Sequence, residues 1–236
     1  MMSIAVIIVA AGSGSRLGGS VPKQFQDLCG VPVVTRAAWA FDGLADRILV
    51  AVPAGYVENA RRDLFGALTW SVMPEVLAGG RERWESVARC LELLDDSTQH
   101  VLIHDGARPL VTRELVRRLV DEVRSSGAVI AALPERNTLK KVAAGGAISA
   151  TLDRADVWEA QTPQAFELAT LKAAYAGFDA AAGAPTDDSA LVERLGVPVR
   201  VIEGEEQNLK ITTEFDLRLA RILLPALTPL AGGGPR

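Results

Sequence analysis

A glycine-rich segment near the N-terminus, Ala10 to Lys23, has the composition of a phosphate-binding loop. Its small residues let backbone N–H groups approach an anion closely, and Arg16 and Lys23 supply positive charge. Two common motifs do not fit, because Leu17 stands where the dinucleotide pattern needs its third glycine and no Gly-Lys-Ser/Thr follows Gly14. Taken alone, the glycines are also compatible with a plain flexible turn.

Further residues capable of chemistry follow apolar runs. Asp105 and Arg108 come directly after one run, in Asp105-Gly-Ala-Arg108. Asp105 suits a ribose or Mg²⁺ contact, with helix capping as the alternative. His100 and His104 share one face of the same run, but two histidines without a third ligand make a poor metal site, so we expect them to pack and hydrogen-bond.

Buried strands and amphipathic helices must position these residues, and the sequence alternates between them. Continuous apolar runs predict strands buried on both faces of a parallel sheet, at residues 4–11, 47–52, 100–104, 128–133 and 197–202. Helical spacing predicts helices from Pro32, over 84–94, over 115–123 and from Thr213, where Thr213-Glu-Phe-Asp216 is a capping-box pattern. We therefore predict one α/β domain with a Rossmann-like, mostly parallel sheet over residues 1–227, which binds ligands at the carboxyl ends of its strands.

Residues 135–160 interrupt this alternation. Two short β-runs, 138–142 and 147–152, flank Gly145-Gly146 and predict a protruding β-hairpin arm. A hairpin with few apolar residues is not stable alone, so we expect it to pack on something, with a second subunit as the candidate. The segment 228–236 is predicted to be a disordered tail.

The amino-acid composition excludes some classes of function for this protein. The 236 residues are 49% hydrophobic, which is ample for a core, and 25 Lys+Arg against 29 Asp+Glu give a net charge of −4. This balance argues against a nucleic-acid coat but permits anionic substrates. The first apolar run is far shorter than the roughly twenty residues of a membrane span, and Cys29 and Cys90 form no CxxC pair. We expect a cytoplasmic protein with neither nucleic-acid nor membrane partners.

Seven segments resemble, in order and spacing, those of a known enzyme family. They are residues 10–25, 78–87, 104–111, 134–142, 151–166, 185–193 and 203–217. The loop is similar to that of nucleotidyltransferases, and the full set most resembles the 2-C-methyl-D-erythritol 4-phosphate cytidylyltransferases of non-mevalonate isoprenoid biosynthesis. The resemblance implies a homodimer that transfers CMP from CTP to this acceptor with Mg²⁺. Such a reaction needs positioning and cations rather than a protein base, because the attacking phosphate is already anionic.

The same resemblance implies roles for individual residues. Arg16, Lys23 and Lys210 would be catalytic, on the triphosphate and beside the α-phosphate. The implied CTP-binding residues are Ala10, Ala11, Gly12, Ser13, Gly14, Gly79, Gly80, Ser86, Asp105 and Gly106. The implied acceptor-binding residues are Arg108 and Thr162 of the home subunit and Thr138 and Arg154 of the partner's arm. Mg²⁺ would be held mainly by the CTP phosphates, with Asp105 as the candidate protein ligand.

For several of these residues, a purely structural or solvent-exposed role is an alternative to a role in the site. Lys210 could be a solvated lysine, Arg154 an interface ion pair, and Arg83 either a structural closure of its loop or a surface ion pair. Asp187 and Asp188 have the position of acids at a helix N-terminus. Gly106 and Arg81 depart from the family pattern without removing a charge that the reaction needs.

Two other functions remain in view. A cytidylyltransferase for another polyol phosphate, notably ribitol 5-phosphate, would share the loop and differ in the acceptor pocket. A non-catalytic CTP-sensing domain would use the loop without turnover, and the joint presence of Arg16, Lys23 and Lys210 argues against it.

Overall fold

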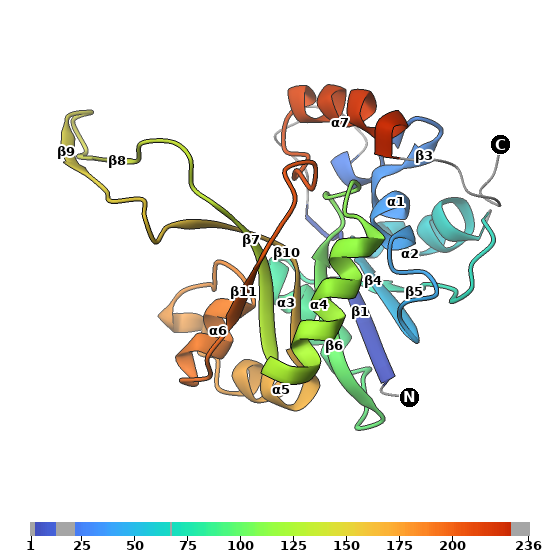
Figure 1. Cartoon of the computed structure of the whole chain (residues 1–236). Helices are drawn as coiled ribbons and strands as arrows, with labels where there is room; N and C mark the ends of the chain where they lie inside the picture. The colour runs from blue at the N-terminus through green and yellow to red at the C-terminus, as the bar shows by residue number, and fades with distance from the viewer. Residues whose placement is uncertain (1–2, 13–21, 67, 228–236) are drawn as a thin grey trace.

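A seven-stranded sheet with helices on both faces forms the centre of the molecule (Figure 1). The structure is a computed structural model that describes residues 3–12, 22–66 and 68–227. The strand order is β11-β7-β10-β6-β1-β4-β5. β10 runs antiparallel to its neighbours β6 and β7, and the other pairs are parallel. The predicted α/β class with a mostly parallel sheet is confirmed.

The strands and helices have the following bounds. The central sheet consists of β1 Ser3–Val9, β4 Arg47–Val52, β5 Glu75–Ala78, β6 Thr98–Asp105, β7 Ala128–Pro134, β10 Trp158–Glu167 and β11 Arg200–Glu203. Two small sheets pair β2 Asp27–Leu28 with β3 Val31–Pro32, and β8 Lys140–Val142 with β9 Ile148–Thr151. The α-helices are α1 Val33–Trp39, α2 Val57–Asn59, α3 Arg83–Leu91, α4 Arg113–Ser126, α5 Leu168–Ala176, α6 Ser189–Arg194 and α7 Glu214–Leu227. Short 3-10 turns lie at Lys23–Phe25, Ala54–Tyr56 and Ala180–Ala182, and a π-helical turn at Ala60–Phe65.

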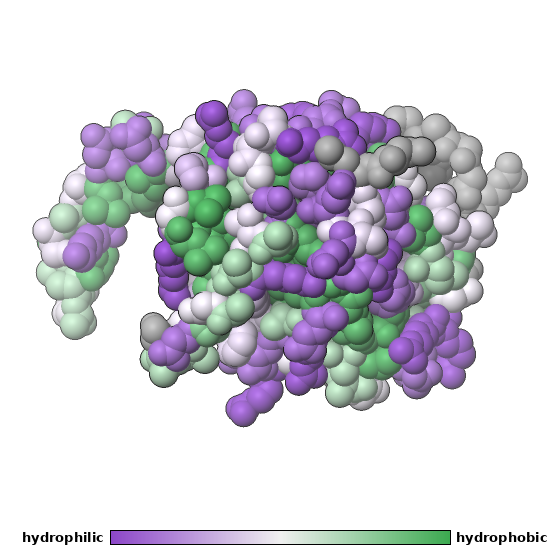
Figure 2. Space-filling model, turned by 90° about the horizontal axis from the view of Figure 1, so that it is seen from below, coloured by the Kyte–Doolittle hydropathy of each residue, from purple (hydrophilic) through white to green (hydrophobic). Residues whose placement is uncertain are grey.

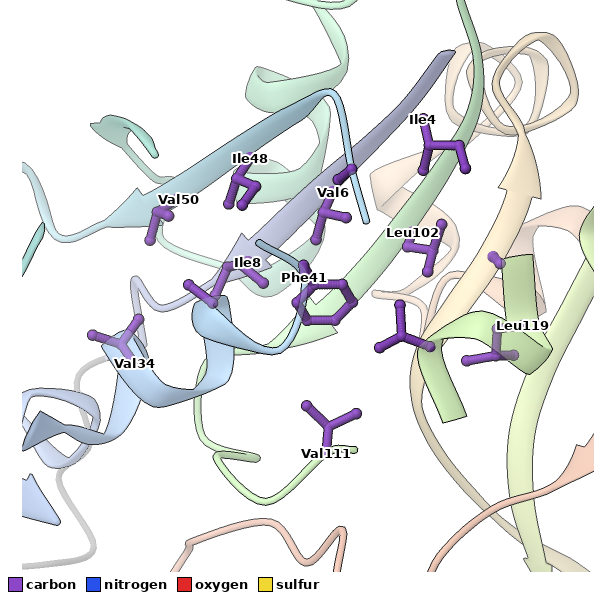
Figure 3. Packing of buried hydrophobic residues seen from close by; sticks show 14 of the residues in the cluster. Ile4, Val6, Ile8, Val34, Phe41, Ile48, Val50, Leu102, Val111 and Leu119 are labelled. Atoms are coloured by element: carbon purple, nitrogen blue, oxygen red, sulfur yellow. The ribbon is translucent and has the colours of Figure 1, made fainter. Parts of the chain in front are cut away.

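The continuous apolar character of β1 reflects burial on both of its faces. Ile4, Val6 and Ile8 belong to the cluster under α1 and α4, where Figure 3 shows them gathered near Phe41. Ala5 and Ile7 belong to the opposite cluster under α3, α5 and α6. Because neighbouring residues of a strand point to opposite faces, a strand between two helix layers needs apolar residues throughout.

The structure corrects several predicted boundaries. The first strand ends at Val9, so Ala10 and Ala11 belong to the following loop. Pro32 lies in β3 and precedes α1, which ends at Trp39. α3 ends at Leu91 rather than residue 94, and the last strand begins at Arg200 rather than residue 197.

Other elements have no counterpart in the prediction, and β10 matters most for the site. Its buried stretch includes Gln161, Thr162 and Gln164, whose polar side chains hide the apolar pattern of a strand. The Thr162–Pro163 peptide bond is cis, and the pairing of β10 with β7 shifts register between Ala160 and Gln164. The sequence pattern also missed β5, α5 and the helical turns over 57–65, whereas the start of α6 was expected from Asp187 and Asp188.

The predicted hairpin is present as β8 and β9, which project from β7 and β10 well away from the body (Figure 1). Its residues are almost all exposed, and they include apolar side chains: Val142, Ile148, Leu152 and, at its base, Trp158. Seen from below, the arm carries both green and purple patches and stands clear of the sheet domain (Figure 2).

The last helix, α7, begins with the predicted capping box. Thr213 Oγ1 accepts a hydrogen bond from Asp216 N at 3.2 Å, and Asp216 Oδ2 accepts one from Thr213 N at 2.7 Å. Leu217 and Ala220 then pack against Leu28 and Val33. Within the described residues, no helix has both the length and the apolar character needed to cross a membrane.

Candidate active site

A pocket opens at the carboxyl ends of β1 and β6, where an open α/β sheet is expected to bind its ligand. We call it the loop pocket. It is lined by Val9, Ala10, Ala11, Gly12, Lys23, Gln24, Gly80, Arg81, Glu82, Arg83, Ser86, Asp105, Ala107 and Lys210. Val9 and Asp105 are register partners at the ends of the two strands, so the pocket floor is fixed by the sheet itself.

The two ends of the glycine-rich loop are tied together by a residue that the sequence analysis did not single out. Gln24 is buried, and its Nε2 donates hydrogen bonds to the Ala10 carbonyl at 2.6 Å and the Gly12 carbonyl at 2.8 Å. Lys23 thereby lies on the pocket wall beside Gln24. The predicted site residues Ser13, Gly14 and Arg16 lie outside the described residues.

A second loop, residues 79–82, closes the pocket and requires small residues. A Cβ on Gly79 would lie 2.4 Å from Ala11 Cβ and 2.8 Å from Ser86 Oγ, closer than real contacts allow. Ser86 Oγ accepts a hydrogen bond from Gly80 N at 3.0 Å and donates to the Glu82 carbonyl at 3.3 Å. Ser86 is buried, and its hydroxyl holds the loop through these two hydrogen bonds.

Asp105 lies at the centre of a cluster of cations. Lys210 Nζ is 2.7 Å from its Oδ2, Arg83 Nε donates to its Oδ1 at 3.1 Å, and Arg108 Nε lies 3.9 Å from Oδ2. Burial alone would raise the pKa of Asp105, but the charges of Arg83 and Lys210 outweigh it and hold that pKa below its ordinary range. Asp105 is therefore an ionised carboxylate, and its backbone N is fixed by a hydrogen bond to Thr162 Oγ1 at 3.0 Å.

His104 is a structural residue in this cluster. It is fully buried against Phe41, with one ring nitrogen 3.0 Å from the Arg108 carbonyl and the other 3.1 Å from Thr162 Oγ1. Burial lowers the pKa of His104 to about 4, so the ring is neutral at neutral pH. His100 is also buried, so both histidines pack as expected, but the Nδ1 atom of His100 has no hydrogen-bond partner among the described residues.

Arg83 makes contacts that neither predicted alternative includes. Its guanidinium bridges two buried carboxylates, with Nε on Asp105 and Nη1 2.7 Å from Asp188 Oδ2. It is thus neither a surface ion pair nor only a loop closure. The helix-capping role predicted for the two acids belongs to Asp187, which accepts a hydrogen bond from Ala190 N at 3.0 Å, whereas Asp188 points to Arg83.

A second pocket lies on the other side of this cluster, against β10. We call it the β10 pocket. It is lined by Arg83, Asp105, Arg108, Ala160, Gln161, Thr162, Gln164, Thr186, Asp187 and Lys210. Three of these residues, Arg83, Asp105 and Lys210, also line the loop pocket and form a wall shared by the two.

The loop that carries Lys210 is held on both sides of that residue. Arg108 Nη1 donates to the Asn208 carbonyl at 2.7 Å, and Ile211 N donates to the Ala107 carbonyl at 2.8 Å. Asn208 is fully buried, and its Nδ2 donates to the Thr162 carbonyl at 2.8 Å. Lys210 is therefore positioned by fixed backbone although its own side chain is 42% exposed.

The two arm residues of the predicted acceptor site are not brought to either pocket within one chain. Thr138 and Arg154 are exposed on the arm, and Arg154 Nη1 donates to the Arg136 carbonyl. Gly106 also lines neither pocket; it lies beneath the loop pocket, where an added Cβ would meet Ala10 Cβ at 3.0 Å.

The charges of the shared wall suit anionic groups. Within residues 3–12, 22–66 and 68–227, no group of three or more His, Cys, Asp or Glu side chains is arranged to hold a metal ion. Both oxygens of Asp105 are already in ion pairs. The shared wall carries more positive than negative side chains, so it can hold two anionic groups next to each other, one in each pocket.

Sequence reasoning missed the roles of several residues near the site, among them Gln24, Asn208 and Asp188. Asn208 and Asp188 lie inside segments whose pattern was noticed, 203–217 and 185–193, but their partners are far away in sequence. No local spacing signals such contacts.

Comparison with known proteins adds an independent finding. The family model for IspD, 2-C-methyl-D-erythritol 4-phosphate cytidylyltransferase, matches residues 4–226. The enzyme of that name from Rhodococcus jostii is 44% identical over 94% of this chain and 95% of its own length. The crystal structure of the Thermus thermophilus enzyme covers 95% of this chain and 100% of its own, with 34% identity and a TM-score of 0.77. The 4-diphosphocytidyl-2C-methyl-D-erythritol synthase of Anaerococcus prevotii covers 95% and 99%, with 29% identity and a TM-score of 0.81.

Proposed function

Because this chain belongs to the family of 2-C-methyl-D-erythritol 4-phosphate cytidylyltransferases, we propose that it transfers CMP from CTP to 2-C-methyl-D-erythritol 4-phosphate in isoprenoid biosynthesis. The products are 4-diphosphocytidyl-2-C-methyl-D-erythritol and pyrophosphate. The observation that carries the proposal is the wall of Arg83, Asp105 and Lys210 between two pockets. For a phosphoryl group to pass between two phosphate-bearing substrates, the substrates must be bound next to each other. Two pockets that share cationic side chains allow this.

In the proposed reaction CTP occupies the loop pocket and the acceptor the β10 pocket. An acceptor phosphate oxygen attacks the α-phosphorus of CTP, a new P–O bond forms, and the bond to the β-phosphate oxygen breaks with its electron pair leaving on pyrophosphate. Negative charge builds on the α-phosphoryl oxygens and the leaving group. Lys210 faces both pockets and stabilises the charge on the α-phosphoryl oxygens, while Lys23 and Arg16 act on the triphosphate.

No residue needs to remove a proton, because the attacking phosphate is ionised at neutral pH. His104, the histidine beside the cluster, is neutral and its ring nitrogens are engaged with Arg108 and Thr162. The ion pair of Lys210 with Asp105 holds the ammonium in place before substrate arrives, so little reorganisation is needed during the reaction.

We also propose that Mg²⁺ enters with the triphosphate. Within the described residues the donor set suits a cation held mainly by CTP, since Asp105 is already ion-paired with Arg83 and Lys210. When bound, the ion would neutralise charge on the phosphates. The two unpaired cysteines, Cys29 and Cys90, are consistent with the cytoplasmic location that forms part of this proposal.

The proposed enzyme is a homodimer in which each arm completes the partner's acceptor site. Thr138 and Arg154 would then bind the acceptor phosphate from the neighbouring subunit. Two observations support this: these residues reach neither pocket of their own chain, and the arm exposes Val142, Ile148 and Leu152.

The decisive experiment measures pyrophosphate release with CTP, Mg²⁺ and one of two acceptors, 2-C-methyl-D-erythritol 4-phosphate or ribitol 5-phosphate. We expect a higher kcat/KM with the branched C5 acceptor. A clear preference for ribitol 5-phosphate would reject the assigned acceptor, and CTP binding without turnover of either would reject catalysis.

A further inference from the structure

Asp188 is a buried charge that the proposed reaction does not use. It is fully buried at the start of α6, outside the linings of both pockets. Its Oδ1 accepts a hydrogen bond from Tyr175 Oη at 2.6 Å, and its Oδ2 lies 2.7 Å from Arg83 Nη1. Burying a carboxylate costs several kcal/mol unless it is paired, and replacing a buried ion pair by apolar residues is often neutral. Stability alone therefore gives little reason to place a charge here.

The partner of Asp188 connects it to the shared wall. Arg83 uses Nε for Asp105 and Nη1 for Asp188, two nitrogens of one rigid, planar group. Two anchors fix the orientation of that plane, whereas a single anchor would let it turn about the remaining contact. Arg83 Nη2 and Asp188 Oδ2 are buried and have no hydrogen-bond partner among the described residues, so Arg83 and Asp188 are held together as an ion pair and not every donor of the guanidinium is satisfied.

Asp105 in turn holds the ammonium of Lys210. Its Oδ1 faces Arg83 and its Oδ2 faces Lys210, so a rotation of the guanidinium would be transmitted through the carboxylate to Nζ. Asp188, Arg83, Asp105 and Lys210 thus form an alternating chain of negative and positive groups. The chain begins in the protein interior and ends between the two pockets.

We propose that Asp188 is a positioning residue for the reaction, which acts through Arg83 to fix Asp105 and thereby the place of Lys210 between the two substrates. The inference rests on the proposed function, since it assigns Lys210 to the transferred phosphoryl group. Lys210 acts on charge that develops in the transition state, so misplacing it lowers kcat more than it raises the KM for CTP.

The test is a double-mutant cycle of Asp188→Asn and Arg83→Gln, with kcat measured at saturating CTP and acceptor. Asp188→Asn keeps the size and an acceptor for Tyr175 but removes the charge opposite Arg83. We expect kcat to fall about tenfold or more, since a displacement near 1 Å can cost about 100-fold, while the KM for CTP changes less than about threefold. The double variant should be no slower than Arg83→Gln alone, because Asp188 acts only through Arg83.

Tyr175→Phe is the matched control. It removes the hydrogen bond to Oδ1 of the same carboxylate and leaves the ion pair of Oδ2 with Arg83 in place. We expect a lower Tm with kcat within about twofold of wild type. Equal kcat losses in Tyr175→Phe and Asp188→Asn, or multiplicative losses in the double variant, would mean that Asp188 only supports the fold and would overturn the inference.

Arg83→Lys keeps the inference testable should Asp188→Asn fail to fold. A lysine retains the charge between the two carboxylates but cannot hold both with a fixed plane. We expect it to lose as much kcat as Arg83→Gln, and near-wild-type kcat in Arg83→Lys would refute positioning by the plane. Turnover of the wild-type protein in the same assay distinguishes failure of the proposed function from failure of this inference. If the wild type does not turn over, the proposed function fails. If the wild type turns over and the variants have the same kcat, only the inference is refuted.

Discussion

Replacing Lys210 with alanine should slow turnover strongly while leaving the fold intact. Lys210 Nζ lies 2.7 Å from Asp105 Oδ2 and faces both pockets. Losing one preorganised group that stabilises transition-state charge typically costs about 10²- to 10³-fold in kcat, equivalent to about 3–4 kcal/mol. The same change should lower the free energy of unfolding by less than about 1 kcal/mol, because the lysine side chain is 42% exposed and solvent screens its ion pair.

We expect the fold to survive this substitution because Asp105 keeps its other cations. Arg83 and Arg108 remain at the carboxylate, so Asp105 stays ionised. Lys172 offers a matched control, since this α5 lysine donates to the Leu94 carbonyl and lines neither pocket. Lys172→Ala should keep kcat within about twofold of wild type.

The assay follows pyrophosphate release at saturating CTP and acceptor, with urea unfolding of the same preparations. A kcat of Lys210→Ala within tenfold of wild type would refute the role assigned to the shared wall. A parallel collapse of stability would show instead that Lys210 is needed to neutralise Asp105.

Three further predictions can be measured on the same preparations. Lys23→Ala should abolish pyrophosphate release with little change in Tm, and unchanged turnover would contradict its assignment to the triphosphate. If the proposed homodimer with shared sites forms, mixing Lys23→Ala with Arg154→Ala subunits should restore about a quarter of wild-type activity, since half of the dimers at random would be mixed and each would hold one intact site of two; no recovery would argue against a shared site. The pKa of His104 is depressed by burial to about 4, so the unfolded chain binds more protons than the folded one between pH 6.5 and 4. Stability should therefore fall by up to about 3 kcal/mol as pH falls through this window, and urea midpoints of wild type and His104→Gln should converge at low pH.

Gly79 provides a steric test of the loop pocket. A methyl group there would meet Ala11 and Ser86, so Gly79→Ala should raise the KM for CTP at least fivefold by displacing the 79–82 loop. Gly145→Ala, on the arm turn with open space around its Cβ position, is the control. Equal KM values for the two variants would mean that the close approach at Gly79 is unimportant for CTP.

The sequence predicted those parts of the fold whose signal is local. The run from Ile4 to Val9 is apolar at every position because both faces are covered, and the capping box at Thr213 uses residues three apart. The Gly-Gly turn of the arm is equally local. These features depend on neighbours along the chain, so their patterns survive in the sequence.

The missed features depend on contacts between distant residues. In β10, Gln161 and Gln164 are buried because they bind backbone of the 204–208 and 187–189 segments, so the strand lacks an apolar pattern. Asp188 looked like a helix-capping acid because its partner Arg83 lies in a different loop. The sequence thus predicted which loops form the candidate site. Which charged side chains pair with each other became clear only from the three-dimensional structure.

The wall between the two pockets has a consequence for inhibition. Lys210 and Arg83 border both pockets, and the proposed reaction seats one substrate in each. A molecule with two anionic ends, one in each pocket, would then engage the same cations as both substrates together. Joining the ends makes the second contact intramolecular, at an effective concentration set by the linker. A substitution at the wall that weakened binding of such a compound would also weaken binding of both substrates. Resistance mutations at these residues would therefore lower the activity of the enzyme.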